Sequence, residues 1–157
     1  MEFREITRIK QALTKEECEE ILKNEPRGVL AVLGDNGYPY ALPINHYYKN
    51  GILFFHSGKT GHKTDAIRSC DKASFCVYDK GYRKPGDWAL NIKSVIVFGR
   101  IEIMENEEEA LEICRELSRK FTSDEEYINK EIERSGAGVL CFKLIPEHMT
   151  GKLVNES

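Results

Sequence analysis

Two tight turns constrain the fold of this chain more than any other feature of its sequence. Gly34-Asp35-Asn36-Gly37 and Lys49-Asn50-Gly51 each separate runs rich in apolar and aromatic residues. Turns of this kind join antiparallel strands, whereas parallel strands need crossover connections of a dozen residues or more. The two turns therefore exclude a doubly wound parallel sheet and predict antiparallel strands over 28–33, 38–48 and 52–56.

The rest of the chain alternates further strands with helices. Thr14-Lys15-Glu16-Glu17 fits a capping box that opens a helix, and Pro26 closes it. Proline cannot donate to a strand ladder, so Pro43 indicates a sheet edge or a local break. We expect three more strands, at 72–78, 94–104 and 138–145. We also expect three more helices, at 64–70, from 106 onward and at 125–134. The sequence thus predicts a mainly β (α+β) fold, a small closed or split antiparallel β-barrel of six strands with peripheral helices, as a single domain over 1–157.

Composition excludes several classes of function. A net charge of −3 leaves no basic excess for general nucleic-acid binding. No run approaches the roughly 20 apolar residues of a membrane-spanning helix, and the charged N-terminus lacks a secretory apolar region. We therefore expect a cytoplasmic protein. The five cysteines form no C-x-x-C pair, and the spacing of His46, His56 and His62 matches no metal motif, so we expect reduced, mostly buried thiols and no metal site.

The loop between 57 and 63 carries the composition of a phosphate site. Ser57, Lys59, Thr60, His62 and Lys63 surround two glycines just before an expected helix. Amides at a helix N-terminus and a lysine bind phosphate well, and glycines let the backbone approach an anion. The same residues also suit an ordinary helix start, in which Ser57 or Thr60 caps the helix and the lysines are solvated. Spacing alone leaves both interpretations open.

An ordered set of segments resembles a known family. The chain lacks the G-x-S-x-G elbow and any Cys–His signature of nucleophilic enzymes. It is instead similar to the pyridoxamine 5′-phosphate oxidase-like FMN-binding split barrels, in particular to the branch with the nitroimidazole-resistance reductases. The segments that carry the resemblance cover most of the chain in order: GVLAVLGDNGYPYALPINHYY, ILFFHSGKTGHKTDAIR, KASFCV, KSVIVFGRIEIM with its glutamate-rich helix, and HMTGK.

The resemblance implies a homodimer with one FMN at each end of the interface. It also implies a role for particular residues. Those matching the flavin-ring stretch are Leu42, Pro43, Ile44 and Asn45; those near the ribityl phosphate are His56 and Ser57, with His62 and Lys63 as the phosphate-binding pair; Asn91 and Ser94 match a strand start beside the ring or ribityl chain; and Trp88 covers the flavin from the partner subunit or acts as a hydrophobic plug.

Two functions are compatible with these residues. The first is an FMN-dependent oxidoreductase that reduces small aromatic acceptors of the nitro type, in which the flavin does the electron chemistry and no side chain need be a nucleophile. His46 or Tyr47 could then deliver a proton or simply pack, so no catalytic residue is assigned. The second is a flavin- or haem-binding sensor, or a dimeric scaffold, without turnover. True pyridoxamine phosphate oxidases have an arginine-led run on the 40–45 strand, which is absent here and argues against that substrate.

Overall fold

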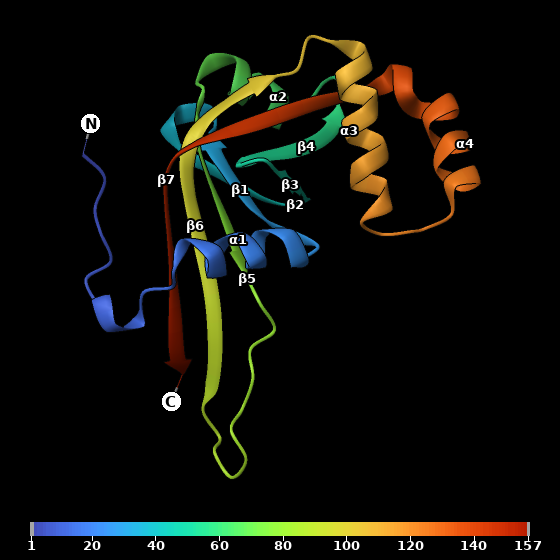
Figure 1. Cartoon of the computed structure of the whole chain (residues 1–157). Helices are drawn as coiled ribbons and strands as arrows, with labels where there is room; N and C mark the ends of the chain where they lie inside the picture. Colours follow the sequence, from blue (N-terminus) through green and yellow to red (C-terminus); the bar gives the residue numbers. More distant parts are fainter. Residues whose placement is uncertain (1, 157) are drawn as a thin grey trace.

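The computed structural model describes residues 2–156, which form one curled antiparallel sheet of seven strands with four α-helices around it (Figure 1). The sheet order is β2-β1-β5-β6-β7-β4-β3. No helix of this described part is long and apolar enough to cross a membrane. The elements in chain order are α1 (Lys15–Asn24), β1 (Arg27–Leu33), β2 (Pro39–Asn45), β3 (Tyr47–Lys49), β4 (Ile52–Gly58), α2 (His62–Ser69), β5 (Lys72–Tyr78), β6 (Leu90–Ile103), α3 (Glu107–Arg119), α4 (Glu125–Ser135) and β7 (Val139–Glu156).

The two longest strands, β6 and β7, curl the sheet into a half-barrel. They pair along their length, with a shift of register between Phe98 and Gly99. Such an irregularity bends a strand pair and increases its twist. Only glycine fits at position 99, because a Cβ there would overlap the Ile145 carbonyl oxygen. The bend brings the two ends of the sheet order toward each other.

Alternating side chains fill the inside of the curl. The buried residues of the central strands share one face, whereas their neighbours in sequence point outward, as strand geometry requires. Helix α1 adds Cys18, Ile21 and Leu22 to this core. Helix α3 packs instead on the outer side of the sheet, over a smaller cluster that includes Phe54 and Cys141. Figure 1 shows α3 and α4 extending to one side of the barrel.

The predicted fold class is confirmed, but the sheet has seven strands where six were expected. The expected strand over 38–48 is two strands, β2 and β3, which lie at opposite ends of the sheet order. Pro43 lies within β2 opposite Val29, so its edge position is confirmed, whereas the break comes at His46. The strands do not form a simple meander either, because β4 pairs with β7 and β1 with β5. The last strand runs to Glu156, because its pairing with β6 continues past Pro146.

His46 is the residue at which the chain passes from one sheet edge to the other. It is fully buried, and its Nε2 lies 2.7 Å from the Leu22 carbonyl oxygen at the end of α1. A carbonyl only accepts, so Nε2 carries the proton and donates. Lys120, just after α3, donates to the carbonyl oxygens of His46, at 2.9 Å, and of Glu25. His46 thus connects the crossover to α1 directly and to the end of α3 through Lys120.

Burial sets the charge states of this pair. Burial and the nearby Lys120 ammonium lower the pKa of His46 to about 4, so its imidazole is neutral near neutral pH. Burial lowers the pKa of Lys120 to about 8. The Nδ1 atom of His46 has no hydrogen-bond partner among the described residues. The crossover is therefore held by a neutral histidine that is costly to protonate.

We predict that acid destabilises the fold through His46. Between its ordinary pKa of 6.5 and about 4, the unfolded chain binds a proton there and the folded chain does not. The unfolded state then binds more protons, so the free energy of unfolding decreases as the pH falls through this window. His46→Gln keeps an N–H donor without titrating. Urea unfolding at about pH 7 and about pH 4 should show a smaller loss for the variant, by about 3 kcal/mol.

His56→Gln is the matched control for this experiment, because His56 is exposed and the effect of its lowered pKa should be smaller. An identical pH dependence in wild type and His46→Gln would contradict the assignment of a neutral, buried His46.

Candidate functional site

A groove lies on the outer surface of the barrel, where the curl brings edge strand β2 beside β4. Its volume is about 370 Å³, and its lining is Arg27, Pro43, Ile44, Asn45 and His56. Three residues of the predicted ring stretch thus meet the predicted His56, although they lie on different hairpins. The fourth, Leu42, packs against the interior core. Leu42 is not among the residues that line the groove.

Edge strand β2 brings free backbone groups to the groove. It pairs with β1 on one side and has no ladder partner on the other within the described residues. Every second residue of an edge strand therefore has its N–H and C=O available for a ligand, except that Pro43 offers only its C=O. Pro43 fits this edge because its missing donor costs no ladder bond there.

Arg27 is a groove residue that the sequence analysis missed. It opens β1 directly opposite Asn45, and its Nε donates to Asn45 Oδ1 at 3.2 Å. The guanidinium brings a positive charge to the same stretch as Pro43 and Asn45. The signal was available in the sequence, because counting back from the Gly34–Gly37 turn places residue 27 opposite residue 45.

The start of α2 has the features of an anion site. Gly61 is its N-cap, with a φ of 133° that favours glycine, and no side chain caps the helix. The alternative in which Ser57 or Thr60 caps α2 is therefore wrong. The first amides of the helix remain without a side-chain partner, and they carry the partial positive charge of its dipole.

Two groups that can carry positive charge face each other next to this helix start. Burial lowers the pKa of the half-buried Lys63, and no carboxylate acts against that shift. Partial burial, and after it the charge of Lys63, lowers the pKa of His56, although much of the His56 side chain is exposed. A dianion between them would relieve their repulsion. Lys63 is not among the residues that line the groove, but it places a positive charge near the groove residue His56.

His62 points to the turn between β1 and β2. Its ring stacks on Tyr40 with centroids 4.1 Å apart, and its Nε2 accepts from the Asp35 amide at 3.3 Å. The proton of a neutral ring must then be on Nδ1, which is the atom left for a ligand. The hydrogen bond and the stacking contact thus fix the orientation of the His62 ring. Its role in phosphate binding stays a prediction.

The other predicted residues lie outside the groove of their own chain. Ser57 shares the inward parity of Phe55 and so points away from the face of His56. Asn91 is buried. Its side-chain Nδ2 donates to the Tyr82 carbonyl oxygen, and its Oδ1 accepts from Asn155 Nδ2. Ser94 lines a separate cavity of about 540 Å³ beside the N-terminal segment. Their roles, like that of Trp88, stay predictions.

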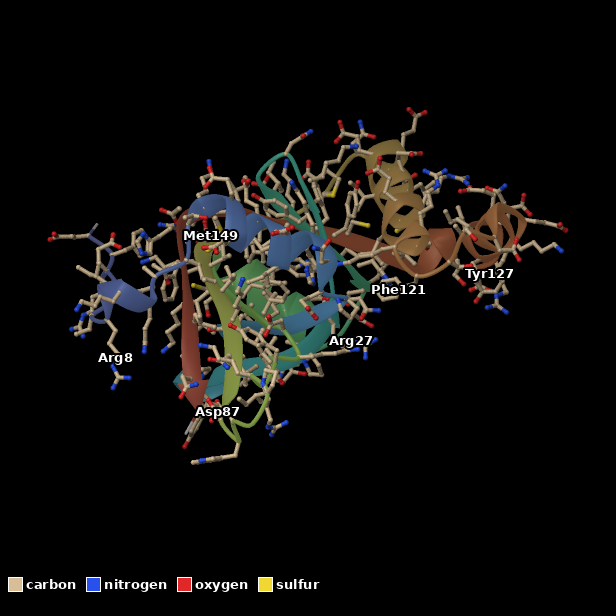
Figure 2. The ribbon with its side chains drawn as sticks, turned by 60° about the horizontal axis from the view of Figure 1, so that its bottom comes forward. Arg8, Arg27, Asp87, Phe121, Tyr127 and Met149 are labelled. Atoms are coloured by element: carbon tan, nitrogen blue, oxygen red, sulfur yellow. The ribbon has the colours of Figure 1, made fainter. Side chains whose placement is uncertain are left out.

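Trp88 lies on the long loop between β5 and β6 and is 72% exposed. Its neighbour Asp87 is at the tip of this loop, well apart from Arg27 (Figure 2). Trp88 is not among the residues that line the groove of its own chain.

A larger cavity lies elsewhere and is less suited to an anion. It has a volume of about 770 Å³ and lies between the N-terminal segment, α1 and β7. Its lining includes three carboxylates, from Glu5, Glu19 and Glu147, against one lysine, Lys15, and none of the predicted site residues. These negative charges repel a phosphate. The smaller groove is therefore the candidate site.

Comparison with known proteins places the chain in a family. The family model described as pyridoxamine 5′-phosphate oxidase matches residues 14–153. The chain belongs to this family. The pyridoxamine 5′-phosphate oxidase family is one of flavin-dependent oxidoreductases, so the groove belongs to a flavin-binding fold. No curated protein matches the chain.

Solved structures show the same fold at low sequence identity. A candidate 5-nitroimidazole antibiotic resistance protein from Bacteroides thetaiotaomicron is 22% identical, with a TM-score of 0.80 over 92% of this chain and 87% of that chain. A FAD-binding protein from Mesorhizobium loti is 23% identical, with a TM-score of 0.66 over 92% and 97%. A FAD- and haem-binding protein from Mycobacterium smegmatis is 19% identical, with a TM-score of 0.73 over 92% and 73%.

Proposed function

We propose that this protein binds FMN in the groove between β2 and β4 and reduces small, planar aromatic acceptors of the nitro type. The observation that carries the proposal is that one outer groove joins the free edge of β2 to His56, whose pKa is lowered by the nearby charge of Lys63. A flavin mononucleotide has the same two parts, a planar ring with a polar edge and a phosphate. The described residues fit both.

Each part of the groove has a role in binding. The α2 amides and the Lys63 ammonium bind the phosphate, and the edge of β2 offers its backbone to the ring. Bound FMN supplies the electron chemistry, whereas the protein orients it and tunes its charge. The Arg27 guanidinium, which lies beside Asn45, favours negative charge on the part of the flavin ring that contacts Pro43–Asn45. None of these roles requires a nucleophilic side chain.

The lining supports the proposed class of acceptor. Pro43 and Ile44 are apolar, and Arg27 is the one permanently charged side chain of the lining within the described residues. A phosphorylated vitamin would need a cation cluster of its own beyond the one that holds the cofactor phosphate. A planar, weakly polar acceptor needs only an apolar surface over the ring.

A homodimer would close the groove, and an apolar outer face supports one. Pro43, Val29, Cys76 and Ile96 are register neighbours on the adjacent strands β2, β1, β5 and β6, and their side chains point outward. Val29 and Ile96 are each 37% exposed. A contiguous apolar patch of this kind is typical of an interaction surface. The patch begins at the groove residue Pro43. A second copy bound to it would cover the flavin and bring its own Trp88 to the flavin ring.

We predict that Lys63→Ala weakens FMN binding by about one to two decades in Kd, because a charge-assisted contact contributes about 1.5–3 kcal/mol. Riboflavin lacks the phosphate, so its affinity should change little. Lys59→Ala is the control, because Lys59 lines a different cavity. Flavin fluorescence titration measures both ligands. Equal losses for FMN and riboflavin would show that Lys63 does not contact the phosphate.

The interface prediction is that Ile96→Lys yields a monomer. Wild type should sediment as a dimer of twice 18.0 kDa at micromolar concentration, and the buried charge in the variant should prevent association. Tyr127→Lys is the control, because Tyr127 is 54% exposed on α4, away from this face (Figure 2). A wild-type monomer with FMN bound would contradict the dimer.

Stopped-flow kinetics test the reaction class. We expect the photoreduced holoprotein, without oxygen, to be reoxidised by a nitroaromatic in a single turnover. Pyridoxamine 5′-phosphate should leave the oxidised holoprotein unchanged, or reduce it only slowly, because the lining lacks a second cation cluster. Rapid reaction with pyridoxamine phosphate and none with the nitroaromatic would return the chain to vitamin oxidation. No reaction with either compound would support a flavin-binding module without turnover.

A further inference from the structure

Two cysteines far apart in sequence meet between α3 and β7. The Sγ atoms of Cys114 and Cys141 lie 3.4 Å apart, across 27 positions of the chain. All five cysteines are free thiols, with Cys18 and Cys141 buried and the other three half-buried. The expectation of mostly buried thiols thus holds for two of the five. Cys114 and Cys141 lie in the cluster under α3, near the point where β7 begins (Figure 1).

Helix and strand geometry hold the two sulfurs together. Ala110 and Cys114 are four residues apart and so share one face of α3. The Cys141 thiol lies 3.3 Å from the Ala110 carbonyl oxygen and is thus positioned by the same helix face. A disulfide needs a separation of about 2.05 Å, so the sulfurs must approach by about 1.4 Å. Side-chain rotation can supply a shift of that size.

The two thiols are not equivalent. Cys141 is 1% exposed, whereas Cys114 is half-buried. The contact between the two sulfurs lowers the pKa of Cys114, whereas the same contact and burial raise the pKa of Cys141 well above its ordinary value. Cys114 is therefore the thiol that ionises, and a thiolate is the reactive form of cysteine. Cys141 keeps its proton until a partner sulfur is oxidised.

A cavity gives small molecules access to the pair. Its volume is about 520 Å³, and Cys114 and Cys141 line it together with Lys59, Met104 and Glu105. It shares no lining residue with the groove between β2 and β4. Cys141 is nevertheless the register partner of the groove residue His56, so the dithiol is a second site next to the proposed flavin site. A molecule as small as a hydroperoxide can enter the cavity.

We propose that Cys114 and Cys141 are a reversible oxidation site that takes small hydroperoxides as its oxidant. The Cys114 thiolate attacks the outer oxygen of the peroxide, the O–O bond breaks, and alkoxide or hydroxide leaves and takes up a proton. The Cys114 sulfenic acid that results is attacked by the Cys141 sulfur. The S–S bond forms, the S–O bond breaks, and water leaves with the Cys141 proton. Two thiols are oxidised and one peroxide is reduced, and a dithiol reductant reverses the reaction.

The disulfide would fasten α3 to β7. The closed loop includes α4, so oxidation would hold the whole α3–α4 unit against the sheet. Helix α3 leads directly to Lys120, which binds the crossover at His46. The oxidised protein should therefore unfold at a higher temperature than the reduced protein, and a reductant should abolish the difference.

The test is cysteine mapping of the full-length protein, which needs neither flavin nor turnover. Reduced wild type is treated with one equivalent of hydrogen peroxide, alkylated, digested and analysed by mass spectrometry without reductant. We expect a peptide pair joined through Cys114 and Cys141, with the loss of two hydrogens, about 2 Da, as the dominant product. Intermolecular links through Cys70 or Cys76, or thiols left unreacted at Cys114, would overturn the proposal.

Three variants separate the roles of the two sulfurs. Cys141→Ser should leave a sulfenic acid at Cys114 that dimedone traps, and Cys114→Ser should leave Cys141 unmodified. Cys70→Ser is the matched control and should give the same link as wild type, because Cys70 lies at the end of α2. Dimedone labelling of Cys141 in Cys114→Ser, at the rate seen for Cys114, would contradict the order of attack. The mapping in wild type decides the proposal even where a variant folds poorly.

Discussion

The crossover at His46 is the contact on which the rest of the structure depends. The chain leaves β2 at one edge of the sheet and enters β3 at the other with a single residue between them. This is possible only because the curl brings the two edges together. His46 donates to the end of α1, and Lys120 donates to the His46 carbonyl oxygen, so both helices fix the seam. The groove on the outside of that seam is a direct consequence.

The electrostatics of the groove point to a ligand that carries negative charge. Lys63 and His56 both have pKa values lowered by burial, and their proximity lowers that of His56 further. The protein supplies no carboxylate to offset Lys63. Such an arrangement costs stability in the empty protein, and a phosphate would recover that cost on binding. The placement of Lys63 near His56 is therefore a feature of a binding site more than of a stable fold.

Local chemistry explains which features the sequence could predict. The turns at Gly34–Gly37 and Lys49–Gly51 and the capping box at Thr14 depend on neighbouring residues, and the structure contains all three. The break at His46 depends on Leu22 and Lys120, which are distant in sequence, so no local pattern shows it. The hydrogen bond from Lys120 to the His46 carbonyl oxygen could not be predicted for the same reason. Arg27 is different, since the hairpin register alone could have placed it beside Asn45. The groove thus brings together the predicted Pro43–Asn45 stretch and His56, and Arg27 is its one lining residue that was missed among those described. The contacts that fix the crossover could not be predicted, because they join residues distant in sequence.

The most direct test of this account is the crystal structure of the protein grown with FMN. The account predicts electron density for the flavin ring along Pro43–Asn45 on the outer seam, with the phosphate against Lys63 and the first amides of α2. Density for FMN in the larger cavity beneath the N-terminal segment, or a phosphate away from Lys63, would contradict it.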